Sequence, residues 1–216
     1  MLAVAPKIAR PENNVNTQDP KSELRDILLA RSVRQGNFTL ASGKTSDFYV
    51  DAKQTTSDPR GALLVGKLGW EIIRQKSEGL GIQVDGIGGL TMGADWIALS
   101  IGIAARLDSA QNNITVFSVR KDPKKHGLQK VIEGNFVAGQ TVVVVDDVIT
   151  TGGSTIKAID AIKAAQGRVA FVIVLVDRQE GGRENIEKCG AKVVSIFTRA
   201  DLIGSDAARH SQIAVT

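Results

Sequence analysis

One stretch of this 216-residue chain carries most of its structural information: Val142-Val143-Val144-Val145-Asp146-Asp147-Val148-Ile149-Thr150-Thr151-Gly152-Gly153-Ser154-Thr155. It opens with four valines, and a strand that is apolar on both faces is typical of a parallel sheet covered by helices on both sides. Two carboxylates, a turn rich in threonine and glycine, and a predicted helix over residues 155–165 follow, and Gly167 is expected to end that helix. We therefore expect an α/β fold that binds ligands beyond the carboxyl ends of its strands.

Further apolar runs of strand length surround this stretch. They cover Val84–Ile87, Ile114–Val119, Thr141–Val145, Val169–Val176 and Val193–Phe197, and helical stretches alternate with most of them. The N-terminal part is different. It predicts a helix over residues 22–31 with Ser22 as N-cap, then a hairpin whose strands, Phe38–Leu40 and Phe48–Val50, flank a turn at residues 42–44. A longer helix is expected to open at Pro59.

Composition narrows the function classes. The chain has 27 Lys and Arg against 23 Asp and Glu, a net charge of +4, and only 4% aromatic residues, which leaves few platforms for stacking bases. Cys189 is the only cysteine and His126 and His210 are the only histidines, which excludes an intramolecular disulfide and argues against a zinc or His-rich metal centre. No apolar run approaches the roughly 20 residues of a membrane span. We expect a cytoplasmic protein without nucleic-acid or membrane partners.

The residues after the valine strand fit two kinds of chemical group. Glycines that bring backbone N–H groups close to a ligand, hydroxyls and a helix N-terminus suit a phosphate monoester. Asp146 and Asp147 accept hydrogen bonds only, so they suit the two vicinal hydroxyls of a ribose. Together they indicate a ribose 5-phosphate. The alternative is an ordinary strand–turn–helix in which the aspartates cap the helix, the glycines allow the chain to turn, and no ligand is bound.

This stretch resembles the phosphoribosyl-pyrophosphate (PRPP) signature of type I phosphoribosyltransferases. The resemblance implies a central, mostly parallel sheet flanked by helices, with a small N-terminal hood. It also implies that PRPP is bound by Asp146, Asp147, Val148, Ile149, Thr150, Thr151, Gly152, Gly153 and Ser154. We accordingly divide the chain into an N-terminal arm (residues 1–20) and a single domain (residues 21–216), with its hood at about 21–58 and its core at about 59–204.

A basic segment follows another predicted strand: Arg120-Lys121-Asp122-Pro123-Lys124-Lys125-His126-Gly127. It is similar to the catalytic loop of the orotate-specific members of the family. The resemblance implies catalytic and PRPP-binding roles for Arg120, Lys121, Lys124 and His126, a catalytic role for Asp147, and a homodimer in which this loop reaches the neighbouring subunit's site. Cations there would stabilise the departing pyrophosphate. A solvated basic loop or a nucleic-acid patch remains the alternative.

Three further segments resemble parts of the same family. Residues 38–51 resemble the hood, which assigns Tyr49 and Lys44 to orotate, although an ordinary hairpin would look alike. Residues 177–182 carry Arg178, whose guanidinium matches a carboxylate and is implied to bind orotate together with Thr150; the alternative is a surface Asp–Arg pair. Residues 85–95 resemble a pyrophosphate-binding loop, or else form a tight turn. Three residues depart from frequent family choices: Ala41, Gly93 and Gln129.

The resemblance implies a reaction as well. Ribose 5-phosphate would pass from PRPP to N1 of orotate, giving orotidine 5′-monophosphate and pyrophosphate, a step of pyrimidine biosynthesis. Mg²⁺ would be carried by PRPP near Asp146 and Asp147, without direct protein ligands. Two alternatives stay open: a phosphoribosyltransferase for a purine or uracil, and a non-catalytic regulator that senses PRPP.

Overall fold

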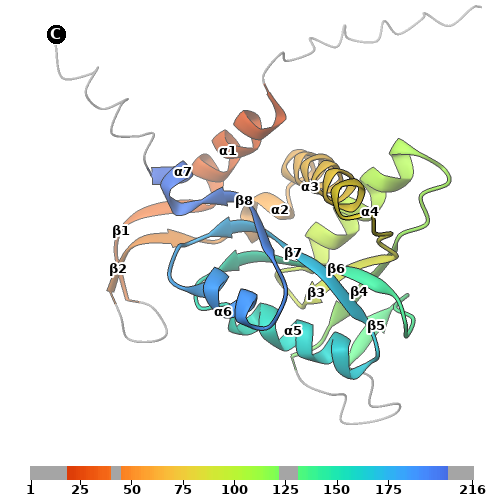
Figure 1. Ribbon diagram of the computed structural model, residues 1–216. Helices are drawn as coiled ribbons and strands as arrows, with labels where there is room; N and C mark the ends of the chain where they lie inside the picture. Colours follow the sequence, from red (N-terminus) through yellow and green to blue (C-terminus); the bar gives the residue numbers. More distant parts are fainter. Residues whose placement is uncertain (1–18, 40–44, 122–130, 204–216) are drawn as a thin grey trace, which may run out of the picture.

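The computed structural model describes residues 19–39, 45–121 and 131–203 and shows an α/β fold (Figure 1). Its main sheet has six strands in the order β5-β4-β3-β6-β7-β8. In chain order the strands are β3 (Gly86–Leu90), β4 (Thr115–Val119), β5 (Ile132–Gly134), β6 (Thr141–Ile149), β7 (Arg168–Asp177) and β8 (Val193–Thr198). All neighbours are parallel except β4 and β5, so the predicted, mostly parallel sheet is confirmed.

Helices cover both faces of this sheet, as the apolar strands require. The helices α3 (Pro59–Leu80) and α4 (Asp95–Asp108) lie on one face, and α5 (Gly153–Ala164) and α6 (Gly182–Lys188) lie on the other (Figure 1). Side chains of β6 alternate accordingly: Val143 and Val145 belong to the core under α3 and α4, and Val142 and Val144 belong to the core under α5 and α6. The four valines are therefore buried from both sides.

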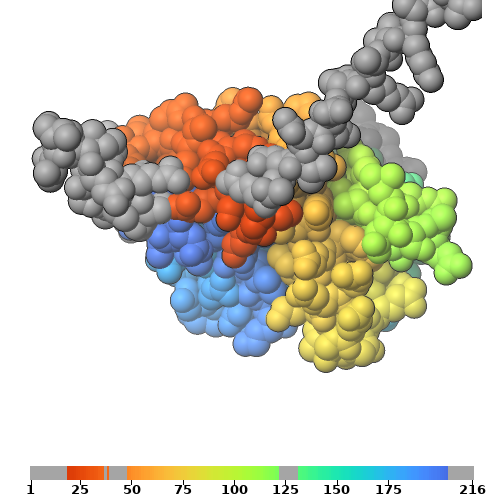
Figure 2. Space-filling model, turned by 90° about the horizontal axis from the view of Figure 1, so that it is seen from above, coloured from red at the N-terminus to blue at the C-terminus, as the bar shows by residue number. Residues whose placement is uncertain are grey.

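The N-terminal part packs against the carboxyl end of the sheet. It consists of α1 (Pro20–Arg31), the antiparallel strands β1 (Val33–Thr39) and β2 (Thr45–Val50), and the single turn α2 (Lys53–Thr56). The predicted hairpin is confirmed, whereas its turn at residues 42–44 and the predicted arm before Asp19 lie outside the described residues. Viewed from above, the red and orange N-terminal elements lie beside gold α3 and the blue C-terminal part, which ends in α7 (Arg199–Ile203) (Figure 2).

Two predicted helix ends differ from the structure. Asp19, and not Ser22, caps α1: its Oδ2 accepts from the backbone N–H of Ser22 at 3.1 Å, and Pro20 occupies the first helical turn, where a missing N–H costs nothing. After α5 the left-handed residue is Gln166, with φ of 62°. Gly167 serves packing instead, since a Cβ there would come within 2.8 Å of the Phe136 ring.

Strands β3 and β5 also differ from the sequence-based expectation. Strand β3 begins at Gly86 and continues to Leu90, beyond the predicted end at Ile87. Its glycines gave no strand pattern in the sequence, but they allow the strand to pack closely on its neighbours. A Cβ at Gly88 would lie 2.4 Å from the carbonyl oxygen of Phe117 in β4. The three-residue edge strand β5 was not predicted at all. No helix in the described part of the chain combines the length and apolarity that crossing a bilayer requires.

Candidate active site

The two neighbouring aspartates lie where β6 projects beyond β3. Pairing between β3 and β6 ends at Gly88 and Val144, whereas β6 and β7 stay paired as far as Ile149 and Asp177. Asp146 and Asp147 follow Val145, just beyond the last residue of β6 that pairs with β3. The strand ends at Ile149 rather than at Val145, so both carboxylates are held by a regular strand and not by a loop.

Asp146 is the more buried of the pair, with 4% of its surface exposed. Its Oδ2 accepts a hydrogen bond from Thr155 Oγ1 at 2.6 Å, and its Oδ1 accepts from the backbone N–H of Asp147 at 3.0 Å. Burial raises the pKa of Asp146 to about 7; the hydrogen bond from Thr155 opposes this shift and the charge of Asp147 adds to it. A carboxyl poised near neutrality thus lies beside a second one.

Asp147 is more accessible and touches two other parts of the chain. Its Oδ1 accepts from the backbone N–H of Val148 at 2.8 Å, and its Oδ2 lies 4.0 Å from Lys53 Nζ. The turn between β3 and α4 lies against it, since a Cβ at Gly93 would come within 2.5 Å of Oδ1. Lys53 was missed from the sequence, because its position over the acidic pair depends on how the hairpin packs.

Two cavities meet at this acidic pair. The loop cavity, about 200 Å³, is lined by Asp146 and by residues 148–154. The lysine cavity, about 300 Å³, is lined by Lys53, Lys121, both aspartates, Val148, Ser154 and residues 90–93. Both cavities share Asp146, Val148 and Ser154. One ligand can therefore extend from the glycine turn, across the carboxylates, to the two lysines.

The glycine turn has the geometry of an anion site. Gly152 precedes α5 with φ of 81°, a conformation that favours glycine, and residues 152–154 form the start of the helix, where N–H groups are unpaired by the helix itself. The turn is supported from outside by α6. A Cβ at Gly182 would lie 2.5 Å from the carbonyl oxygen of Thr150, and Asn185 Nδ2 donates to the carbonyl oxygen of Thr151 at 3.1 Å. Asn185 was not identified from the sequence.

Arg178 joins the sheet to the hairpin. It follows β7, is only 5% exposed, and its backbone N–H donates to the carbonyl oxygen of Ile149 at 3.1 Å, next to Thr150. Its Nη2 donates to the carbonyl oxygen of Phe48 at 3.2 Å and lies 2.7 Å from Glu180 Oε1. The alternative of a surface Asp–Arg pair is wrong, because Arg178 is buried and Asp177 pairs instead with Arg183 at 3.2 Å.

Of the other predicted site residues, three are described by the structure and three are not. Tyr49 lies on the hairpin, 42% exposed, with its ring 5.6 Å from that of Phe38. Arg120 and Lys121 follow β4; Arg120 Nη1 lies 3.8 Å from Glu133 Oε1, and Lys121 reaches the lysine cavity. Lys44, Lys124 and His126 lie outside the described residues, as do Ala41 and Gln129.

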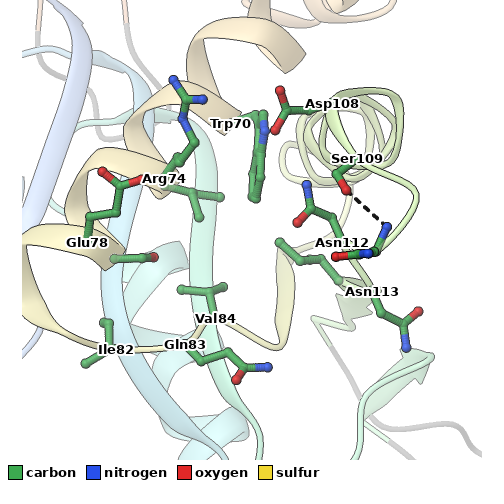
Figure 3. Close-up of a pocket in the computed structure, with 14 residues that line it drawn as sticks. Trp70, Arg74, Glu78, Ile82, Gln83, Val84, Asp108, Ser109, Asn112 and Asn113 are labelled. Carbon is green, nitrogen blue, oxygen red and sulfur yellow. Dashed lines mark hydrogen bonds between the residues drawn. The ribbon is translucent and has the colours of Figure 1, made fainter.

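A third cavity lies at the opposite end of the strands from the acidic pair. It measures about 480 Å³ and opens between the end of α3 and the segments that precede β3 and β4 (Figure 3). Trp70, Arg74 and Glu78 line it from α3, and Asn112 and Asn113 face them from the segment before β4 (Figure 3). Because it lies at the amino ends of the strands, it belongs to a different region from the acidic pair.

Comparisons with known proteins agree with this arrangement. The model of the phosphoribosyl transferase domain matches residues 52–205. An orotate phosphoribosyltransferase of Aquifex aeolicus (strain VF5) is 42% identical, covering 85% of this chain and 97% of the relative. One of Rhodopseudomonas palustris (strain BisB5) is 40% identical, covering 85% and 96%.

Solved structures agree as well. The orotate phosphoribosyltransferase of Mycobacterium tuberculosis H37Rv in complex with Fe(III) dicitrate is 37% identical, with a TM-score of 0.73 over 86% of this chain and 99% of that one. The same enzyme in complex with PRPP is 34% identical, with a TM-score of 0.69 over 85% and 99%.

Proposed function

The chain belongs to the phosphoribosyl transferase domain family, and on that basis we propose that it transfers ribose 5-phosphate from PRPP to N1 of orotate, giving orotidine 5′-monophosphate and pyrophosphate. The observation that carries the proposal is the pair of cavities that meet at Asp146, the second of which Asp147 also lines. The glycine turn, the carboxylates and the lysines that line them match the three groups of PRPP: a phosphate, a ribose diol and a diphosphate. The protein is accordingly a transferase that acts in pyrimidine biosynthesis.

Each part of PRPP has a chemical counterpart in the site. The 5-phosphate takes the loop cavity, where the N-terminus of α5 offers N–H groups and a positive dipole end. Asp146 and Asp147 accept hydrogen bonds from the ribose hydroxyls. The diphosphate takes the lysine cavity, where Lys121 supplies positive charge. Positive charge at the leaving group stabilises the transition state, in which the bond from C1′ to the diphosphate oxygen breaks.

The acceptor base is placed by Arg178 and Thr150. Arg178 supplies a buried cation at the end of β7, and orotate carries a carboxylate that uracil lacks. This favours orotate over uracil as the substrate. N1 of orotate attacks C1′ as the diphosphate leaves with the bonding electrons, through an oxocarbenium-like transition state that requires no covalent protein nucleophile.

The donor set fits Mg²⁺ carried by the substrate. Asp146 and Asp147 provide hard oxygen ligands, but the described residues contain no group of three or more His, Cys, Asp or Glu that could hold a metal ion. Mg²⁺ tends to keep waters and to bind through one or two carboxylates together with substrate phosphates. When bound, it would neutralise charge on the diphosphate, while the two aspartates orient the ribose.

An exposed apolar stripe on α4 supports a homodimer. Leu99, Ile103 and Leu107 repeat every four residues and are 52%, 53% and 78% exposed, and Met92, just before the helix, is 62% exposed. Side chains at this spacing share one helix face, and such a face suits a second copy of the chain. The cytoplasm is the proposed setting, because the single cysteine, Cys189, permits no intramolecular disulfide.

The direct test is turnover by the purified full chain. With Mg²⁺ and PRPP present, we expect the absorbance of orotate to fall and pyrophosphate to form, whereas uracil, adenine and hypoxanthine are turned over far more slowly. Faster turnover of one of these other bases would replace orotate as the acceptor. Tight PRPP binding without turnover of any base would instead identify a regulator that senses PRPP.

A further inference from the structure

Lys53 is the described lysine that lies nearest to the acidic pair. Its Nζ is 2.9 Å from Asp51 Oδ1 and 4.0 Å from Asp147 Oδ2. Its side chain keeps 45% of its surface exposed and lines the lysine cavity, so a ligand in that cavity can reach the ammonium group. At 4.0 Å the contact with Asp147 is longer than a hydrogen bond, which leaves room for the ammonium to bond elsewhere.

The backbone that carries Lys53 is firmly held. Thr55 and Thr56 in the same turn are buried, and the hydroxyls of Thr55 and Ser32 are 2.7 Å apart. Helix α3 packs directly against this turn, since a Cβ at Gly61 would lie 2.2 Å from the carbonyl oxygen of Thr55. The position from which the lysine stem reaches the cavity is therefore fixed by the fold, and only the stem itself adapts.

The charges in the lysine cavity favour a cation at this place. Asp146 and Asp147 both line the cavity, and a carboxylate at Asp147 repels a diphosphate that shares the space. Lys121 is exposed at the end of β4, whereas Lys53 lies beside Asp147 itself. The bond to Asp51 and the charge of Asp147 also raise the pKa of Lys53, so its ammonium stays protonated at neutral pH.

We propose that Lys53 binds the diphosphate group of PRPP and screens it from Asp147, with Asp51 as the residue that positions the ammonium group. The inference rests on the proposed function and adds a residue to it. As the bond from C1′ to oxygen breaks, the diphosphate gains negative charge. The ammonium of Lys53 donates a hydrogen bond to a diphosphate oxygen and keeps its proton. The contact therefore strengthens toward the transition state.

The test compares two ligands that contain a diphosphate with one that lacks it. Binding of PRPP, inorganic pyrophosphate and ribose 5-phosphate is measured by calorimetry, with Mg²⁺ present, for the wild type and for Lys53→Met. Because a hydrogen bond to a charged group contributes about 1.5–3 kcal/mol, PRPP and pyrophosphate should bind at least about tenfold more weakly to the variant. Ribose 5-phosphate, which lacks the diphosphate, should bind within about twofold of the wild type.

Matched variants separate this role from a structural one. Lys76→Met removes the same charge at an exposed position near the end of α3 and should bind all three ligands like the wild type. Lys53→Arg keeps the charge and should restore most of the affinity for pyrophosphate. Asp51→Asn frees the ammonium and should weaken pyrophosphate binding by less than Lys53→Met does. Lys53→Gln replaces Lys53→Met if the thermal unfolding of the latter shows a damaged fold.

Two outcomes would overturn the assignment of Lys53. One is an equal loss of ribose 5-phosphate and PRPP affinity, which would mean that Lys53 only keeps Asp147 in place. The other is unchanged binding of pyrophosphate to Lys53→Met. The proposed function fails separately, if the wild-type protein turns over no orotate, and the binding comparison can be read without that assay.

Discussion

Gly93 lies against Asp147 so closely that a single methyl group at position 93 would come within 2.5 Å of the carboxylate Oδ1. The turn after β3 thus fixes one side of the residue expected to hold the ribose. Any side chain at this position would require Asp147 to move. In this chain the cation beside Asp147 comes from α2, as Lys53.

Gly93→Ala should weaken PRPP binding more than it weakens the fold. The atom in the way is the end of a side chain, so Asp147 can swing aside at a cost of about 1 kcal/mol or less, but it then loses its place over the ribose. We expect a KM for PRPP several-fold higher and a nearly unchanged Tm. Gly79→Ala is the control: nothing lies within 4 Å of its Cβ, and alanine in a helix stabilises by roughly 0.5–1 kcal/mol.

Gly182→Ala should damage the phosphate end of the site. Its Cβ would meet the carbonyl oxygen of Thr150 at 2.5 Å, and backbone cannot rotate away as a side chain can. The glycine turn must shift, so ribose 5-phosphate and PRPP should both bind about tenfold or more weakly, with a loss of stability of about 1–3 kcal/mol. Calorimetry with both ligands checks this. Weakened binding of PRPP alone would contradict the placement of the 5-phosphate in the loop cavity.

Asp146→Asn should change how stability depends on pH. Burial raises the pKa of Asp146 from 3.8 to about 7, so between these pH values the folded protein binds a proton that the unfolded chain has lost. Stability from this group is complete below pH 4 and is lost as pH rises toward 7. Asparagine removes the effect. The difference between the free energy of unfolding of the variant and that of the wild type should therefore shift in favour of the variant by roughly 1–3 kcal/mol as the pH rises from 4 to 8.

Urea unfolding at a series of pH values measures this difference. Parallel curves for the wild type and Asp146→Asn would show that Asp146 is ionised in the fold across the whole range. The same variant should also bind PRPP more weakly than the wild type above pH 7, where the wild-type side chain is a carboxylate. An amide oxygen accepts a hydrogen bond from a ribose hydroxyl less strongly than a carboxylate does.

The sequence was sufficient for the parts of the fold whose signals are local. The valines of β6, the glycine turn and the start of α3 at Pro59 each depend on neighbours in the chain, and each is found where expected. Strand β5 was not predicted because its three residues, Ile132 to Gly134, are too few to show an alternation of apolar and polar side chains. Their pairing with β4 is set by the fold. Ser22 and Asp19 were equally suitable caps by residue type, and Pro20 favours the earlier one.

The candidate site was predictable to a similar extent. Asp146, Asp147 and the turn after them form a continuous motif. Lys53 and Asn185 act on that motif from distant segments, across contacts that only the folded chain creates. The burial of Arg178 under the hairpin likewise depends on the Phe48 carbonyl, which no pattern around residue 178 reveals.

Arg178→Gln should impair the use of orotate more than that of PRPP. Removing a cation that pairs with a carboxylate costs about 1.5–3 kcal/mol, so the KM for orotate should rise about tenfold or more at saturating PRPP, while PRPP affinity stays within about twofold. Arg178→Lys keeps the charge but loses the planar fork, and it should recover only part of the activity. Because Arg178 also bonds to Phe48, Tm should fall as well. An unchanged KM for orotate would leave Arg178 with the structural role alone.

Mixing two inactive variants should restore activity if the basic segment serves the neighbouring subunit. Asp147→Asn disables the site of its own chain, and Lys124→Ala disables the site that its segment enters. In a mixed dimer, one site then keeps Asp147 from one chain and Lys124 from the other, while the second site lacks both.

Random reassociation of equal amounts makes half of the dimers mixed, each with one working site of two, so activity should return to about a quarter of the wild-type value. Each variant alone should stay inactive, and size-exclusion chromatography with light scattering should show a dimer that is disrupted by Ile103→Glu on the exposed face of α4. If the segment served its own chain, every site in every mixture would lack a required group and no activity would return.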